Sequence, residues 1–241
     1  MSKPITLDLV HPIYNPKTNW EKELWFYFDS FRQSIQIPVE VRLYLVNDGS
    51  SQGILEEQIE FLRSNIELFT YLPLEVNQGK GAALREAMKL CDSEFVIYTD
   101  FDYPYVQANM EEMFQKLLER KSDIVVGVRD EPYYDQLPFR RKVFSLSLKL
   151  MNYLFFPRLK VKDTQSGLKG FNQRGKQIFL KTQIAAFLFD MEFLVLASND
   201  VTIKVDWIYL QVRDGVHFSG MKLKTIITEL INFIRIWVRK K

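Results

Sequence analysis

The order of apolar segments along the chain constrains the fold more than any other feature of the sequence. Short apolar runs of strand length alternate with longer segments of helical periodicity. We expect strands at 6–10, 39–45, 71–76, 95–98 and 123–128, with helices at 56–69, 79–90 and 106–120. Because strands that alternate with helices usually pair in parallel, the sequence predicts an α/β fold with a mostly parallel central sheet and helices on both faces.

Three polar clusters follow predicted strands, at residues 11–16, 47–50 and 99–102. Ligands of parallel α/β sheets bind at the edge formed by the carboxyl ends of the strands. We therefore expect these clusters to meet in one ligand site.

Two carboxylates, Asp100 and Asp102, emerge from the predicted buried strand at 95–98. At this spacing both can turn toward one hard cation, Mg²⁺ or Mn²⁺, whose other positions go to water and substrate phosphates. The simpler interpretation of an isolated pair is an acidic turn, because the pattern is short. Its place at a strand end favours the metal site.

Two further motifs suit a nucleotide or another anion. Asp48 ends a predicted strand, where it can accept hydrogen bonds from a base or ribose, although Asn-Asp-Gly is also a common turn. Lys80 lies between two glycines at a predicted helix start, and N–H groups with a lysine there bind anions. The segment is neither a P-loop nor a G-x-G-x-x-G fingerprint, which argues against ATPase and dinucleotide-binding functions.

The net charge of +2 hides two basic segments. Residues 139–162 contain seven lysines and arginines and no acid, and residues 222–241 contain six against Glu229. Each segment includes a helical apolar stripe, at 143–156 and 223–238. Such helices either pack on the core with solvated charges or lie on an anionic membrane surface, and we favour the membrane over nucleic acid or solvent.

The location expected from the sequence is the cytoplasm. The single cysteine, Cys91, forms no internal disulfide, and no apolar run has the length of a signal peptide or a membrane span. A composition of 47% hydrophobic and 26% charged residues excludes a disordered chain. We expect one domain over residues 1–241, ending in a basic amphipathic helix at about 222–241 and peripheral on the inner face of the membrane.

Seven motifs, taken in order, resemble the family 2 glycosyltransferases of the GT-A fold, a Rossmann-like architecture. They are Pro12–Asn15, Asn47–Ser50, Asn77–Ala83, Asp100–Asp102, Val126–Arg129, Asp163–Phe171 and Phe189–Leu194. The last two are similar to the D-T-Q-x-G-F-K and F-D-x-E-x-L segments of dolichyl-phosphate glucosyltransferases. The resemblance covers the chain from about residue 7 to 222.

The resemblance implies an inverting transfer of a hexose from a nucleoside diphosphate sugar, with a UDP-sugar favoured. The acceptor is either a polyprenyl phosphate at the membrane or a growing glycan. The donor-binding residues it implies are Pro12, Tyr14, Asn15, Asp48, Lys80, Asp100 and Asp102. Asp102, with Asp100, would hold Mg²⁺ or Mn²⁺ as a Lewis acid, while Lys80 and Arg129 would add positive charge at the diphosphate or acceptor.

Further residues are assigned to the acceptor side by the same resemblance. Asp190 falls near the family's base, with Glu192 second; a charge pair at a helix start is the other interpretation. The expected acceptor and phosphate residues are Arg140, Arg141, Asp163, Gln165, Ser219 and Lys222, together with the basic segment 158–162. Ser219 and Lys222 match the late G-x-S-K motif only loosely. Lys169 reads equally as a solvated surface charge.

Some positions depart from the family pattern. Pro16 and Pro104 stand where the family has an acid and a polar residue, and they favour a second hypothesis: a nucleotide-binding regulatory protein without catalysis. His217 either completes a metal shell or is an ordinary hydrogen-bonding residue, which we favour. A sugar nucleotidylyltransferase would need a glycine-rich loop after the first strand, and residues 11–14 are not one.

Overall fold

A computed structural model describes residues 4–129, 131–135, 137–216 and 223–239 of the chain. Its centre is a sheet in the order β3-β2-β1-β4-β6-β5-β7. The strands are β1 Ile5–Ile13, β2 Val39–Asn47, β3 Phe69–Pro73, β4 Phe95–Tyr98, β5 Ile124–Arg129, β6 Lys169–Asn172 and β7 Val205–Leu210. β6 runs antiparallel to both neighbours, and the other neighbouring strands pair in parallel. The predicted α/β class with a mostly parallel sheet is confirmed.

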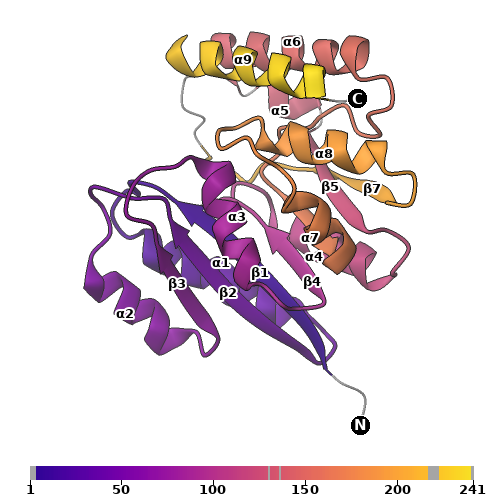
Figure 1. Cartoon of the computed structure of the whole chain (residues 1–241). Coiled ribbons are helices and arrows are strands. Elements are labelled where there is room, and N and C mark those ends of the chain that lie inside the picture. The colour runs from indigo at the N-terminus through magenta and orange to yellow at the C-terminus, as the bar shows by residue number, and fades with distance from the viewer. Residues whose placement is uncertain (1–3, 130, 136, 217–222, 240–241) are drawn as a thin grey trace.

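Helices cover both faces of this sheet (Figure 1). They are α1 Trp20–Ser34, α2 Glu56–Asn65, α3 Lys80–Leu90, α4 Gln107–Leu118, α5 Glu131–Asp135, α6 Phe139–Phe155, α7 Gln173–Phe179, α8 Phe189–Asn199 and α9 Leu223–Arg239. One apolar core packs α3, α7 and α8 against the sheet, and a second packs α1, α2 and α4 against the opposite face. Alternating side chains of the central strands divide between the cores: Leu9 belongs to one and Val10 to the other.

Two long helices, α6 and α9, lie side by side at one end of the molecule, at the top of Figure 1. The ring of Phe233 in α9 packs edge-on against Phe155 and Phe156, with ring centres 5.9 and 5.5 Å apart. The predicted C-terminal helix is therefore present, and it pairs with the other predicted basic helix. Among the helices in the described part of the chain, none has the length and apolar content needed to cross a membrane.

The boundaries of some elements differ from the sequence-based expectation. The helix predicted to extend to residue 69 ends at Asn65, because Phe69 already begins β3 beside β2. β1 continues through Pro12 to Ile13, where a loop was expected, because its whole length pairs with β2. Five elements, α1, α5, β6, α7 and β7, were not predicted at all, and α8 was expected only in the interpretation of Asp190 and Glu192 as a charge pair at a helix start.

Candidate functional site

The predicted polar clusters meet at one edge of the sheet. From β1 the chain adds β2 and β3 on one side and then β4 on the other side, so the order of strands switches direction beside β1. Open α/β sheets bind ligands at such a switch point. The N–H of Asp48 donates to the Ile13 carbonyl at 2.9 Å, and the N–H of Thr99 donates to the Val10 carbonyl at 3.2 Å. The carboxyl ends of β1, β2 and β4 therefore place residues 11–16, 47–50 and 99–102 together.

A lysine and two aspartates form the centre of this edge. Lys80 Nζ lies 2.5 Å from Asp100 Oδ1, which joins the first turn of α3 to the turn after β4. Burial opposes the charge on Lys80, but the carboxylates of Asp100, Asp190 and Asp102 outweigh it and raise the lysine pKa. Lys80 therefore stays a cation beside two acids.

Asp102 lies on the solvent side of this pair. Its side chain is exposed, yet surrounding protein atoms displace part of its water and the Asp100 charge is close, so its pKa is raised to about 6. The backbone carbonyl of Asp102 accepts a hydrogen bond of 3.0 Å from Arg213, whose Nε also donates to the Tyr103 carbonyl at 3.1 Å. Arg213 thus holds the backbone of the turn after β4 and leaves the Asp102 carboxylate accessible.

This pair of carboxylates fits a hard divalent cation. The negative charge of Asp100 disfavours ionisation of Asp102. A divalent cation bound between the two carboxylates would neutralise this repulsion. Within the described ranges, no group of three or more histidine, cysteine or acidic side chains is arranged to hold a metal ion. Two protein carboxylates with the remaining positions left to water and phosphate is the usual arrangement for Mg²⁺.

Asp48 organises the start of α3. Its carboxylate accepts hydrogen bonds from the N–H groups of Gln78 and Gly79, at 2.7 and 2.9 Å, and from Asn77 Nδ2 at 3.0 Å. Burial raises its pKa, against the effect of the two backbone bonds. Gly79 has φ 98°, and a Cβ there would lie 2.6 Å from the Ala185 carbonyl oxygen. The structure thus shows Asp48 positioning the Lys80 turn; contact with a base stays a prediction.

The predicted loop after β1 divides by exposure. Pro12 is buried within β1, whereas the Tyr14 ring is half exposed. Asn15 Oδ1 accepts from the N–H of Ser51 at 2.9 Å, and the Asn15 N–H donates to Ser50 Oγ at 2.9 Å. Asn15 therefore ties this loop to the loop after β2, and Tyr14 is the residue of the three that offers a surface to a ligand.

Arg129 and Asp163 form a buried ion pair. Arg129 Nε donates to Asp163 Oδ2 at 2.9 Å, its Nη2 donates to Oδ1, and its backbone N–H donates to Oδ2 at 2.8 Å. Burial alone would raise the Asp163 pKa, but Arg129 outweighs it and lowers that pKa. The guanidinium also lies over the Tyr133 ring, 4.9 Å from its centre. Asp163 therefore orients Arg129.

Asp190 belongs to a second buried cluster. Its Oδ1 accepts from the Tyr98 hydroxyl and lies 2.8 Å from Lys169 Nζ. Lys169 is fully buried, so the interpretation as a solvated surface charge is wrong. Burial lowers the Lys169 pKa, and Asp190 partly restores it. The sequence gives no indication of this pairing, because the two residues lie on β6 and α8.

Glu192, the second candidate base, holds a backbone turn. Its Oε2 accepts from the N–H groups of Gln183 and Ile184 at 2.8 and 2.7 Å. None of the hydrogen bonds described for Glu192 involves the carboxylates at the end of β4. Its catalytic role therefore stays a prediction.

The segment after Asp163 lies against the β4 edge. A Cβ on Gly167 would fall against Asp100 Oδ2, so a larger residue would force that carboxylate to shift. Gln165 is half-buried, and its Nε2 donates to Thr164 Oγ1 at 3.1 Å. Gly167 is a site residue that sequence analysis missed, although it lies inside the D-T-Q-x-G motif.

The remaining predicted acceptor residues are more peripheral. Arg140 is exposed and Arg141 half-buried, in the first turn of α6. In the 158–162 segment, Lys160 Nζ donates to the Ile203 carbonyl at 2.5 Å and Lys162 Nζ to the Phe156 carbonyl at 2.8 Å. His217, Ser219 and Lys222 lie outside the described residues.

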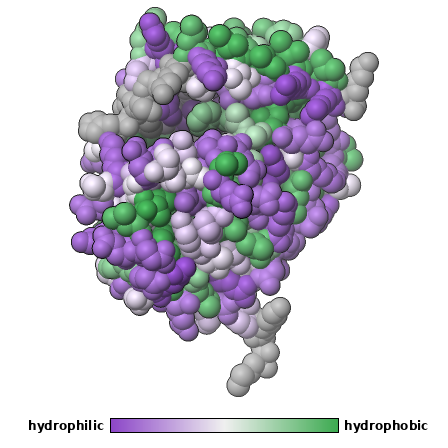
Figure 2. All heavy atoms as spheres, turned by 60° about the vertical axis from the view of Figure 1, so that its left-hand side comes forward, coloured by the Kyte–Doolittle hydropathy of each residue, from purple (hydrophilic) through white to green (hydrophobic). Residues whose placement is uncertain are grey.

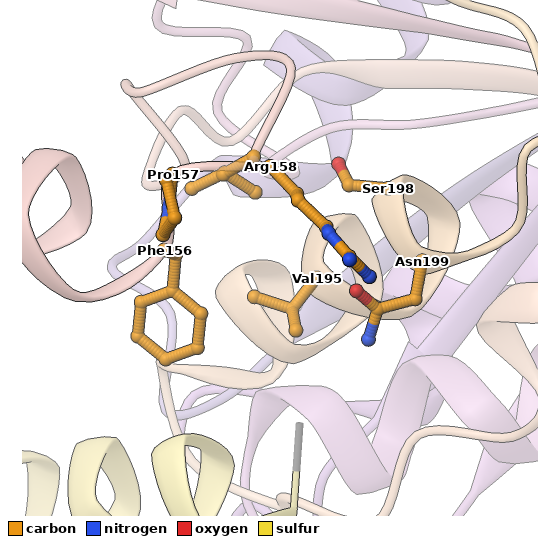
Figure 3. A pocket seen from close by; sticks show the side chains of 7 residues that line it. Phe156, Pro157, Arg158, Val195, Ser198 and Asn199 are labelled. Carbon is orange, nitrogen blue, oxygen red and sulfur yellow. The ribbon is translucent and has the colours of Figure 1, made fainter. Parts of the chain in front are cut away.

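A cavity of about 180 Å³ lies elsewhere, between the connection after α6 and the end of α8 (Figure 3). Its lining is Phe156, Pro157, Arg158, Leu159, Val195, Ser198 and Asn199. Two of these residues, Arg158 and Leu159, belong to the predicted phosphate-binding segment 158–162. Since this lining holds no carboxylate, the cavity is not the proposed metal site.

The sequence matches a protein family and several known proteins. The family model "Glycosyl transferase family 2" matches residues 8–181. A dolichyl-phosphate beta-glucosyltransferase of Trichomonas vaginalis is 25% identical over 240 residues, which cover 96% of this chain and 73% of that protein. The Saccharomyces cerevisiae dolichyl-phosphate beta-glucosyltransferase is 22% identical over 174 residues, 64% of this chain and 52% of its own length.

The fold is also similar to solved structures. Glucosyl-3-phosphoglycerate synthase from Mycobacterium tuberculosis, crystallised with Mn²⁺, UDP-glucose and phosphoglyceric acid, superposes with a TM-score of 0.71 at 14% identity, covering 97% of this chain and 80% of that one. The same enzyme with Mg²⁺ and UDP gives a TM-score of 0.68 at 16% identity and covers 98% and 79% of the two chains. This likeness shows the fold.

Proposed function

Because the chain belongs to glycosyltransferase family 2, we propose that it transfers a hexosyl group from a UDP-sugar to a polyprenyl phosphate at a membrane surface, with inversion at the anomeric carbon. One observation carries the donor half of this proposal. Asp100, Asp102 and Lys80 meet at the carboxyl end of β4, where a cation and a diphosphate can be bound together.

Asp102, with Asp100, would hold Mg²⁺ or Mn²⁺. When bound, the metal supplies positive charge that stabilises the departing diphosphate. The start of α3 contributes the Lys80 ammonium on the same side, at the helix end whose dipole favours an anion. Asp48 holds that turn in place through Gln78 and Gly79. Among UDP-sugars we propose UDP-glucose as the donor, because relatives of this chain are named glucosyltransferases and the similar synthase was crystallised with UDP-glucose.

The acceptor is assigned from the state of the candidate base. A sugar hydroxyl must lose a proton as it attacks, and it needs a free base. Asp190 Oδ1 is already engaged by Lys169 and Tyr98. A phosphate acceptor is ionised before it reacts: its oxygen forms the new bond to the anomeric carbon, the bond from that carbon to the diphosphate breaks, and UDP leaves with the electron pair. No proton has to be removed.

Arg129 and the basic start of α6 support the acceptor side. Arg129 lies on Tyr133, and Lys149 Nζ lies 5.6 Å from the centre of the Tyr134 ring, so α5 and α6 border the Arg129–Asp163 pair. Arg140 and Arg141 are placed in the first turn of α6. We assign the acceptor phosphate to this basic region, with Arg129 oriented by Asp163.

The test is transfer of label from radiolabelled UDP-glucose to polyprenyl phosphate in detergent with Mn²⁺. The proposal expects organic-soluble label with polyprenyl phosphate and none with polyprenol, whose hydroxyl requires a base. The anomeric coupling in the product's NMR spectrum tests inversion. Equal transfer to polyprenol or to an oligosaccharide contradicts the phosphate acceptor, and UDP binding without any transfer favours the regulatory-protein hypothesis.

A further inference from the structure

Helices α6 and α9 expose a broad apolar surface at one end of the molecule. Figure 2 shows hydrophobic side chains gathered there, at the top of the view. The exposed large apolar residues of the two helices define what we call the α6/α9 face. They are Phe139, Val143, Leu146, Leu150, Tyr153, Leu154, Phe155, Leu223, Ile227, Leu230, Ile231, Ile234, Trp237 and Val238. Contiguous apolar surface of this kind marks an interaction site.

The exposed charges on the same two helices are all positive. α6 contains Arg140, Arg141, Lys142 and Lys149 and no acidic residue. In α9 the sole acid is Glu229, and it is buried, while Lys224, Arg235 and Arg239 are exposed. The occupant of the face must therefore tolerate both a broad apolar contact and an array of cations.

We infer that the α6/α9 face is a docking surface for an anionic lipid bilayer. Two amphipathic helices lying side by side present one apolar layer to the acyl boundary and leave their basic residues at headgroup level, where Trp237 also fits. Basic residues near an anionic leaflet are attracted to its headgroups. A second copy of the chain would bring two basic arrays together, which like charges oppose. The inference deepens the proposed function, on which it rests only for the identity of the acceptor.

The inner sides of both helices hold parts of the site. Asn152 in α6 donates to the Lys162 carbonyl at 3.1 Å and to Thr164 Oγ1 at 3.3 Å, beside Asp163 and Gln165. This contact places the acceptor segment directly beneath a docked helix, about one helix diameter of 10 Å from the lipid.

The second helix makes an equivalent contact. Glu229 in α9 accepts from the N–H groups of Phe187 and Leu188, at 3.2 and 3.0 Å, in the turn that precedes Asp190. Docking therefore puts both the acceptor segment and the start of α8 on the bilayer side of the molecule. A phosphate at headgroup level can reach them while its lipid tail stays in the membrane.

The test is co-sedimentation of the full chain with phosphatidylcholine vesicles containing phosphatidylglycerol. The face variant is Leu150→Glu with Ile234→Glu. Its matched control is Phe26→Glu with Val201→Glu, which adds the same two charges at exposed apolar positions on α1 and in the turn after α8. We expect the wild type and the control to sediment with the vesicles, and the bound fraction of the face variant to fall at least tenfold.

Circular dichroism melting curves of both variants serve as the control for folding. Binding of the face variant equal to that of the control overturns the inference, and so does a wild type that stays in the supernatant. A wild-type dimer in analytical ultracentrifugation that the face variant dissociates, without vesicle binding, overturns it in favour of a second copy. Vesicle binding is measured without nucleotide, so a failed sugar-transfer assay leaves it intact, and the two proposals fail separately.

Discussion

Two ion pairs near the proposed reaction differ in the room they leave for a ligand. The side chains of Lys80 and Asp100 are 19% and 38% exposed, and Asp102 beside them is open to solvent. The side chains of Arg129 and Asp163 are 5% and 2% exposed, and their polar atoms are occupied by each other. The first pair can exchange its partners for a cation and a diphosphate, whereas the second fixes the geometry of an arginine. The Lys80–Asp100 pair is therefore open to a ligand, whereas the Arg129–Asp163 pair holds the shape of the neighbouring region.

The sharpest way to break this contrast is to neutralise the exposed acid. Asp102→Asn should reduce sugar transfer about 10³-fold, because a carboxylate that holds the charge-stabilising metal is lost. Its melting temperature should stay within a few degrees of the wild type, since the side chain is exposed. Initial rates with Mn²⁺ measure the first effect. The control is Asp92→Asn, an exposed carboxylate before the opposite end of β4; equal rates for both variants would contradict the donor assignment.

Neutralising the buried acid should have the reverse emphasis. Asp163→Asn leaves the Arg129 guanidinium buried without a counter-charge, which costs about 3–5 kcal/mol of unfolding free energy. Lys80→Gln, at the more exposed pair, should cost about 1 kcal/mol or less. Urea unfolding of the two variants gives the comparison. If Lys80→Gln lowered the free energy of unfolding as much as Asp163→Asn, the distinction between the two ion pairs would be lost.

A pH titration tests the support beneath the donor edge. His11 is fully buried, with Nδ1 3.2 Å from the Thr99 carbonyl oxygen and Nε2 2.9 Å from the Tyr103 hydroxyl, and burial lowers its pKa to about 4. The unfolded chain binds a proton on this histidine below about pH 6.5 and the folded chain does not. The unfolding free energy should therefore fall as pH drops from about 6.5 to about 4, by about 3 kcal/mol in total.

The measurement is the difference between wild type and His11→Gln in urea unfolding at several pH values. The difference removes the opposing contributions of Asp8, Asp48 and Glu229, whose pKa values are raised by burial. A difference that does not change between pH 7 and pH 4 would show that His11 titrates normally.

The smallest expected effect concerns the contact between the two regions. Gly167→Ala places a methyl group against Asp100 Oδ2, so the carboxylate must shift. We expect the Mn²⁺ concentration for half-maximal transfer to rise about tenfold, equivalent to about 1.4 kcal/mol. Gly170→Ala is a comparison variant, because its methyl group would press on Leu117 and Ile97 in the core and not on a carboxylate. It should lower the melting temperature and leave the metal requirement unchanged.

The donor region could be predicted from sequence because its signals are local. The strand at 95–98 is a continuous apolar run followed by Asp100 and Asp102, so strand, strand end and acid pair are read from eight consecutive residues. The same holds for β2 with Asp48 after it. Parallel pairing then places these ends together without further information.

The acceptor region could not be predicted in this way, because its structure depends on contacts between distant segments. β6 is four residues long and is defined by pairing with β4 and β5, not by its own pattern. Lys169 becomes a buried cation only through Asp190 on α8. Helix α1, by contrast, was open to prediction, because Asn19 precedes it and Glu21 and Glu23 lie in its first turn, which are usual start signals of a helix.

The most direct test of the whole account is the initial rate of label transfer from UDP-glucose to polyprenyl phosphate in anionic vesicles, with Mn²⁺ and then with excess EDTA. We expect label in the lipid fraction with Mn²⁺, and loss of that label with EDTA. Transfer that continues at the same rate in EDTA, or label that never enters the lipid fraction in the presence of Mn²⁺, would contradict it.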